Sequence, residues 1–407
     1  MTAATNPTPT ELATRYLAQT RIVDNPEAIN SLLTQQYQRS FVDILTRLDV
    51  APAGQPSLFV AYTPEAQVET VTFGDAEVVI YDQHLGQAFN RLNDFSLASW
   101  PHDHVIKWGF RHLGHSLASL SSTVAASLCL ALAEYLPTPD RPKVAPKQRQ
   151  RRLLTTAIQE YFVLAHECGH SALRRSTTSI GGDHLEDVID AAVKRREARG
   201  FDLNRLHEAM LEDELRAIEA HGIEADDALV EKMRARIRRV PIFKPTSALT
   251  DHAHLREELQ CDLIATQLTV TYMEENGISK MITLPAILHA LHNLNSIEVI
   301  RDLGRVHAKP ERKSDYADGL ALRKTLWREL VPSVYASGAE VELLGGKLTE
   351  ITVQYAHAVG DHFLYMLPYK FEVALAKHGN KSADTKARQV TDIIRKNNET
   401  QRTALAA

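Results

Sequence analysis

The sequence predicts a mainly α-helical protein of the α+β class, with one small β-sheet. Apolar residues recur at helical spacing along most of the 407 residues. Short β-branched and aromatic runs gather only between residues 57 and 82. The hydrophobic fraction of 44% and the charged fraction of 24% are ordinary for a soluble globular chain. We therefore expect a helical body that packs against a single sheet.

Residues 1–50 are predicted to form an N-terminal helical segment. Its apolar side chains follow helical spacing, and they include Ile29, Leu32, Leu33, Tyr37, Phe41, Ile44 and Leu45. Pro52, Gly54 and Pro56 then interrupt the pattern. The first boundary is placed at this interruption.

Three strands are predicted next, in the segments "SLFVAYT", "VETVTF" and "AEVVIYD". Each is rich in β-branched or aromatic residues, and "PEAQ" and Gly74-Asp75 separate them. Consecutive short strands joined by turns favour an antiparallel meander. The sheet is therefore expected to be small and antiparallel, and the helical segment "QHLGQAFNRLNDF" follows it.

The most apolar segment runs from Ser116 to Leu136 and is predicted to be one buried helix. Its length would allow a membrane span, but five serines, one threonine and Glu134 dilute it. Burying Glu134 in lipid would be costly, so no membrane association is expected. The proline-rich and basic stretch from Pro137 to Arg152 is predicted to be an exposed connector.

The net charge bears on the partners of the protein, and the cysteine content favours a reducing compartment. The formal net charge of -5 gives no general attraction to nucleic acid. The three cysteines, Cys129, Cys168 and Cys261, are too few for a disulfide framework. The first residues lack the basic and apolar parts of a signal peptide. We therefore expect a cytoplasmic protein with no nucleic-acid partner.

A metal site is predicted in the stretch "YFVLAHECGHSAL". On a helix, His166 and His170 lie about 5–6 Å apart on one face, so both imidazoles can bind one Zn²⁺ ion. Glu167 follows the first histidine and can accept the proton of a metal-bound water. The preceding turns are apolar, and Gly169 is expected to leave room for a close approach to the metal. The alternative is a helix that carries two solvent-facing histidines.

The third ligand is predicted on a later helix, in "LREELQCDLIA". Glu258 and Asp262 share a helical face, so one carboxylate can bind the ion while the other accepts the free ring N–H of a ligand histidine. Glu258 is preferred as the ligand, with Asp262 behind the histidine. Glu257 is the rival ligand, although it lies about 100° around the helix. A charged outer face paired with Arg256 is the non-functional alternative.

Together, "HECGH" and "EELQCD" resemble the HExxH…ExxxD arrangement of gluzincin metallopeptidases. M48-type and ImmA/IrrE-type bacterial peptidases are the most similar groups, although Cys261 stands where alanine is usual. The resemblance implies a zincin-like core, a zinc ion and a strand that pairs with an extended peptide. It covers the two motif helices and, weakly, the strands. It does not cover the N-terminal helices, residues 183–238 or the last hundred residues.

The expected activity is therefore that of a zinc-dependent metalloendopeptidase acting on a specific protein, in a regulatory or defence role. Tyr316, Arg323 and His307 are candidate donors to the oxyanion of the transition state. Two alternatives stay open. One is a non-catalytic helical scaffold with a structural metal, and the other is a zinc hydrolase of a small amide.

Two further groups of histidines are predicted to be structural. His102, His104, His112 and His115 lie within fourteen residues, and we expect them at the surface or at an interface rather than on a second metal. His289 and His292 occur on an apolar helix and are expected inside the core.

The remaining divisions follow changes in composition. Residues 51–182 contain the sheet and the HExxH helix, and residues 183–245 form a charged helical insertion. Residues 246–378 contain the third-ligand helix and a C-terminal helical region, and residues 379–407 form a polar tail.

Overall fold

The computed structural model describes most of the chain. The described residues are 7–20, 24–50, 55–98, 100–136, 142, 144–175, 182–198, 208, 211–212, 215–216, 219, 225–237, 253–308 and 316–378. The predicted tail, residues 379–407, lies outside them, as does much of the predicted insertion. Within the insertion, α7 (Gly182–Ala198) and α9 (Asp227–Ile237) are helical, as expected.

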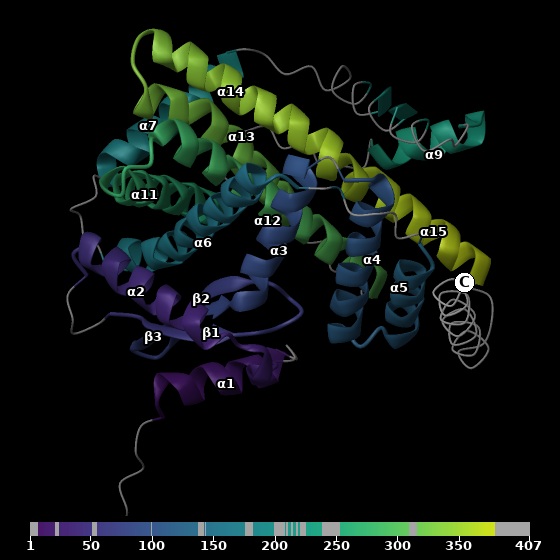
Figure 1. Ribbon diagram of the computed structural model, residues 1–407, viewed down its shortest axis with the longest axis horizontal. Helices are drawn as coiled ribbons and strands as arrows, with labels where there is room; N and C mark the ends of the chain where they lie inside the picture. The colour runs from purple at the N-terminus through teal and green to yellow at the C-terminus, as the bar shows by residue number, and fades with distance from the viewer. Residues whose placement is uncertain are drawn as a thin grey trace, which may run out of the picture.

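The protein is mainly helical, as predicted, with one three-stranded sheet near its N-terminus (Figure 1). The strands are β1 (Ser57–Ala61), β2 (Val68–Phe73) and β3 (Ala76–Asp82). Their order is β1-β3-β2, with β1 parallel and β2 antiparallel to β3.

The predicted antiparallel meander is therefore wrong, and the sheet is mixed. Gly74, with a φ of 61°, closes the β2–β3 hairpin, as the sequence indicated. The strand β3 is buried along almost its whole length, because it lies between β1 and β2 in the sheet. Strand periodicity contains no information about which strand occupies the centre.

Helices cover both faces of the sheet (Figure 1). On one face, Ala13 and Leu17 of α1 (Pro9–Thr20) pack against Val78 and Ile80. On the other face, Val79 and the alternate residues of β3 join the main core together with α2 (Ser31–Arg47) and α6 (Pro146–Arg174). The sheet thus holds α6 on its inner face.

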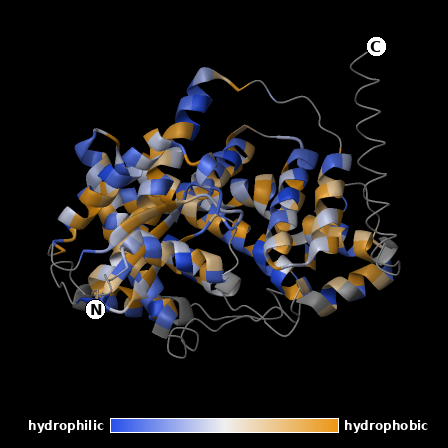
Figure 2. Ribbon diagram, turned by 90° about the horizontal axis from the view of Figure 1, so that it is seen from below, coloured by the Kyte–Doolittle hydropathy of each residue, from blue (hydrophilic) through white to orange (hydrophobic). Residues whose placement is uncertain are grey.

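The helical body surrounds α6. Most helices contain both apolar and hydrophilic residues, as expected of helices with one buried side (Figure 2). The remaining elements are α3 (Gln83–Ala98), α4 (His102–Ser119), α5 (Thr123–Tyr135), α11 (Ala253–Glu275), α12 (Lys280–Ala308), α13 (Tyr316–Tyr335), α14 (Ala339–Tyr355), the π-helical turns η3 (Ala356–Gly360) and η4 (His362–Met366), and α15 (Leu367–His378).

The predicted single helix from Ser116 to Leu136 is wrong, because the chain reverses within it. The helix α4 ends at Ser119, and α5 begins at Thr123 after Ser121, whose φ is 61°. No helix among the described residues is long and apolar enough to cross a membrane. The connector also ends earlier than predicted, because α6 begins at Pro146, a favourable first helical residue.

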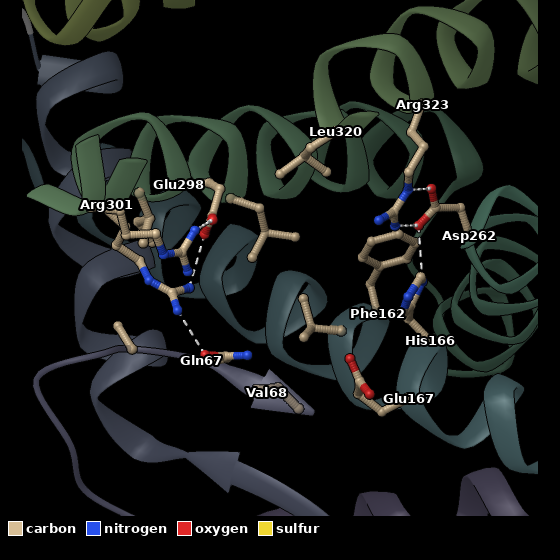
Figure 3. A pocket seen from close by; sticks show the side chains of 15 residues that line it. Gln67, Val68, Phe162, His166, Glu167, Asp262, Glu298, Arg301, Leu320 and Arg323 are labelled. Carbon is tan, nitrogen blue, oxygen red and sulfur yellow. Dashed lines mark hydrogen bonds and ion pairs between the residues drawn. The ribbon is translucent and has the colours of Figure 1, made fainter. Parts of the chain in front are cut away.

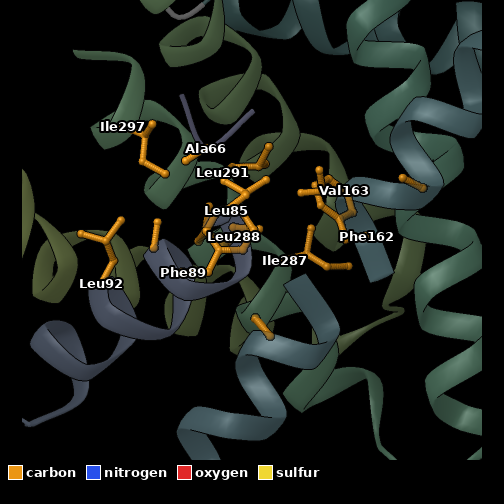
Figure 4. Close-up of a cluster of buried hydrophobic side chains, with 14 of the residues drawn as sticks. Ala66, Leu85, Phe89, Leu92, Phe162, Val163, Ile287, Leu288, Leu291 and Ile297 are labelled. Atoms are coloured by element: carbon orange, nitrogen blue, oxygen red, sulfur yellow. The ribbon is translucent and has the colours of Figure 1, made fainter. Parts of the chain in front are cut away.

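The core between α3, α6 and α12 is apolar (Figure 4), apart from a small network of three buried amide side chains. Within it, Asn93 donates to Gln159 at 2.8 Å and Gln159 donates back to Asn93 at 3.1 Å. Asn293 also donates to Asn93 at 3.1 Å. All three amide side chains are fully buried, so this network joins the three helices.

We predict that Gly86→Ala destabilises the protein by about 1–3 kcal/mol, the usual cost of overpacking. A Cβ at Gly86 would lie 1.9 Å from Oε1 of Glu160. That oxygen accepts hydrogen bonds from Tyr37 at 2.6 Å and Tyr81 at 3.2 Å, so it has little freedom to move.

Urea unfolding followed by circular dichroism measures this effect, and Gly346→Ala is the matched control. Gly346 lies within α14 with open space around it. Alanine there should stabilise the helix by about 0.8–1 kcal/mol. Equal midpoints for Gly86→Ala and the wild type would contradict the prediction.

Candidate metal centre

The helix α6 presents the HExxH residues toward α11. His166, Glu167 and His170 are all buried, because the preceding turns pack into the core. A Cβ on Gly169 would lie 3.5 Å from Cα and Sγ of Cys261. Gly169 therefore faces Cys261 on α11 rather than a metal, which corrects the predicted reason for this glycine.

Three buried side chains converge between the two helices. Nε2 of His166 lies 3.3 Å from Oε2 of Glu258, and Nε2 of His170 lies 3.3 Å from Oε1 of the same carboxylate. One ligand atom from each of the three residues falls within 4.8 Å of the other two. In the part of the chain that the structure describes, this is the only such group of three or more metal-binding side chains. The group can hold a metal ion.

A carboxylate lies behind each imidazole. Oδ1 of Asp262 lies 2.9 Å from Nδ1 of His166, and Oε1 of Glu257 lies 2.8 Å from Nδ1 of His170. Such partners fix the tautomer of a ligand histidine and aim its other nitrogen. The structure thus places Glu258 in the cluster and gives Glu257 and Asp262 matching positions behind the two rings.

Arg323 of α13 completes the buried charge network. It donates to both oxygens of Asp262, at 2.9 and 2.7 Å (Figure 3), and it also donates to Oε2 of Glu258. Of the three candidate oxyanion donors, only Arg323 is placed at the site. His307 packs its ring edge-on against Phe371 of α15, and the side chain of Tyr316 lies outside the described residues.

The charges in the cluster shift one another's pKa values. Burial would raise the pKa of Glu258, but Arg323 and the two histidines hold it well below its usual range. Burial opposes protonation of His166, yet Asp262 and Glu258 raise the pKa of His166 to about 10. Burial raises the pKa of Glu167, against the opposite effect of His166 and His170. A metal ion that binds here must displace the proton from His166.

Glu167 lies on the wall of a cavity of about 420 Å³. Thr70 of β2 donates to Oε2 of Glu167 at 3.0 Å and lies 3.0 Å from its backbone carbonyl oxygen. Phe162 lies beside His166, and Leu320 lies between the two ends of the cavity (Figure 3). The opposite end is polar, where Arg301 donates to Gln67 at 2.7 Å and to Glu298 at 2.9 Å.

Two neighbours of the cluster were not predicted from the sequence. Thr70 lies in β2, and the periodicity of a strand does not indicate which helix the strand packs against. His254 has its Nε2 3.5 Å from Oε1 of Glu258 and is largely exposed at the rim. The i, i+4 spacing of His254 and Glu258 on one helix was a signal that could have identified this contact.

The other histidines are only partly as predicted. His289 and His292 are buried in the core, as expected. His104 and His112 are also buried, which contradicts the predicted surface location. Both lie on the inner face of α4, where Trp108 stacks on His112 with centroids 5.2 Å apart. Burial lowers the pKa of His112 to about 3.

We predict that Arg323→Met lowers the stability of the metal-free protein by about 3–5 kcal/mol, because it removes the guanidinium that pairs with the buried carboxylates of Asp262 and Glu258. Urea unfolding in the presence of a chelator measures the loss. Arg328→Met, on the same helix and without an ion pair to either carboxylate, is the control. A similar small change in both variants would show that the network does not stabilise the fold.

A scan against protein-family models and searches of curated proteins and of solved structures find no match to this chain.

Proposed function

We propose that this protein is a zinc-dependent metalloendopeptidase. The observation that carries the proposal is the convergence of His166, His170 and Glu258 beside Glu167, at the edge of a cavity. Two imidazoles and one carboxylate are a ligand set that catalytic zinc uses in hydrolases. The resemblance of both helical motifs to gluzincin peptidases supports the same assignment.

A catalytic role is favoured over a structural metal by the number of ligands. Structural zinc sites normally have four protein ligands, whereas catalytic sites keep one position open. Among the described side chains, no fourth metal-binding group joins the cluster. His254, whose Nε2 lies 3.5 Å from Oε1 of Glu258, is not part of the group and is largely exposed.

Residues beside the metal cluster would each have one role in the reaction. Zinc, when bound, would acidify the attacking water and polarise the scissile carbonyl. Glu167 would accept a proton from that water and deliver it to the leaving amine. Thr70 would hold the Glu167 carboxylate in place through its 3.0 Å hydrogen bond. Asp262 and Glu257 would keep both histidines in the tautomer that leaves Nε2 free.

An extended peptide is favoured over a small amide as the substrate because of β2. This strand pairs only with β3 in the described sheet, so its other edge has no strand partner there. Val68 and Gln67 line the cavity, and Thr70 touches Glu167. A peptide added to this edge would run past the catalytic carboxylate with its side chains alternating toward the cavity.

The experiment is a cleavage assay on a peptide library, with products identified by mass spectrometry. Purified protein should contain about one zinc per chain, the stoichiometry expected of a single catalytic site, and should cleave internal peptide bonds. Chelation with 1,10-phenanthroline should stop cleavage, and added Zn²⁺ should restore it. Bound metal without cleavage of any peptide would favour the structural-metal alternative.

A further inference from the structure

The cavity beside Glu167 extends from the metal cluster to a second group of charged residues. Asp262 lies at one end of the cavity, Glu298 and Arg301 lie at the other, and Leu320 lies between them (Figure 3). The remaining apolar lining residues come from β2, the segment before it, α6 and α12. A side chain that enters from the metal end therefore passes apolar groups before it meets the charges.

The far end of the cavity is built around Glu298, whose carboxylate is shared by two arginines. Its Oε2 accepts from Nη1 of Arg301 at 2.9 Å, and its Oε1 accepts from Nη1 of Arg305. The side chain of Glu298 is only 4% exposed, so it is poorly placed to bind a cation of a substrate. Glu65 and Asp302 also pair with these arginines, but they do not line the cavity.

Arg305 has hydrogen-bond donors to spare at this end. Both of its hydrogen bonds to described residues leave from Nη1, which donates to Glu298 and, at 2.8 Å, to Asp302. Nε and Nη2 make none there, and neither atom is buried, in contrast to Nε of Arg301. The side chain of Arg305 is 30% exposed, against 10% for Arg301. The N–H groups on Nε and Nη2 form a planar fork that fits the two oxygens of a carboxylate.

We propose that this cavity selects a glutamate residue beside the cleaved bond of the peptide, and that Arg305 binds its carboxylate. This inference rests on the proposed peptidase function. A peptide paired with the edge of β2 would direct alternate side chains to the face on which Val68 lines the cavity. The methylene groups of glutamate would pass the apolar lining and bring the carboxylate to Arg305. Aspartate is one methylene shorter and glutamine has no charge, so both should be poorer substrates.

The test measures kcat/KM of the zinc-loaded full chain on fluorogenic peptides with amidated C-termini. The residues on the two sides of the cleaved bond are varied in turn among glutamate, glutamine, aspartate and leucine. On one side, the glutamate peptide should be cleaved at least about tenfold faster than the glutamine peptide, the discrimination expected from hydrogen bonds to a charged group.

A free C-terminal carboxylate has the same chemistry as the side chain of glutamate. Leucine peptides that end beside the cleaved bond are therefore compared as free acids and as amides. The two forms should be cleaved at similar rates. Faster cleavage of the free acid would assign Arg305 to a terminal carboxylate and overturn the selection of glutamate.

Variants of Arg305 locate the selectivity. Arg305→Gln should lower the ratio of glutamate to glutamine cleavage at least about tenfold, and Arg305→Lys should keep part of the preference. Because the ratio compares two peptides on one preparation, it does not depend on the fraction of folded or zinc-loaded protein. Arg149→Gln removes an exposed arginine that does not line the cavity and should leave the ratio unchanged.

The outcomes separate this inference from the proposed function. Equal cleavage of the glutamate and glutamine peptides, or an unchanged ratio in Arg305→Gln, would overturn the role of Arg305 and leave the peptidase activity standing. Cleavage of no peptide at all would overturn the proposed function, and this inference with it.

Discussion

Glu167→Gln should retain zinc and lose hydrolysis by about 10²–10⁴-fold, the range that general-base catalysis contributes. The carboxylate lies beside the metal cluster without belonging to it, so the amide should not disturb the ligands. Glutamine can still accept a hydrogen bond from Thr70. It cannot take a proton from water, so the chemical step should fail while the site remains assembled. Zinc content and kcat/KM, measured on the same preparation, separate the two effects.

Glu160→Gln is the matched control for this variant. Glu160 is a partly buried carboxylate of the same helix, and its partners are Tyr37 and Tyr81. We expect normal hydrolysis per zinc atom in the control. Full activity in Glu167→Gln would refute the role of Glu167, and loss of zinc would show that it is needed to hold the metal.

Glu258→Gln should lose most of its zinc, whereas Glu257→Gln should weaken binding only about 10–100-fold, as found for residues behind a ligand. The two glutamates are adjacent in sequence but contact different nitrogen atoms of the histidines. Glu258 is 3.3 Å from Nε2 of both histidines, and Glu257 is 2.8 Å from Nδ1 of His170. Competition for zinc with a chromogenic chelator at fixed pH gives both affinities.

The fixed pH matters because metal and proton compete for His166, whose pKa is raised to about 10 in the metal-free cluster. Affinity should therefore rise as pH increases toward that value. Asp190→Asn, at an exposed residue that pairs with Arg256, is a control that removes a carboxylate outside the cluster. If Glu257→Gln were the variant that lost zinc, the ligand assignment would have to be exchanged.

The sequence predicted the parts of the centre that depend on one helix. Because His166 and His170 are four residues apart, any helix places them on one face, and the same holds for Glu258 and Asp262. The convergence of these two faces could be guessed from their chemistry. The contact of Arg323 with Asp262, 61 residues along the chain, could not, because it depends on how α13 packs.

The two wrongly predicted elements, the helix from Ser116 to Leu136 and the antiparallel sheet, also depend on how separate parts of the chain pack. Ser121 adopts a φ of 61° without being glycine, so the turn between α4 and α5 is marked only by the cluster of Ser119, Ser121, Ser122 and Thr123. Leu130 fits against Gly114, where a Cβ would lie 2.9 Å away. The antiparallel pairing of β2 with β3 follows from the local turn at Gly74, whereas the parallel pairing of β1 depends on a crossover that strand periodicity does not encode.

The buried amides of Asn93, Gln159 and Asn293 have a consequence for α6. An apolar helix surface tolerates small rotations, because one hydrophobic contact can replace another. Amide pairs tolerate much less, since a rotation that separates them leaves buried donors unsatisfied. Gln159 precedes His166 by seven residues, close to two helical turns, so it shares the side of α6 that leads to the metal cluster. These amides therefore fix the rotation of α6 about its own axis. They set the direction in which the histidines point in the metal-free protein.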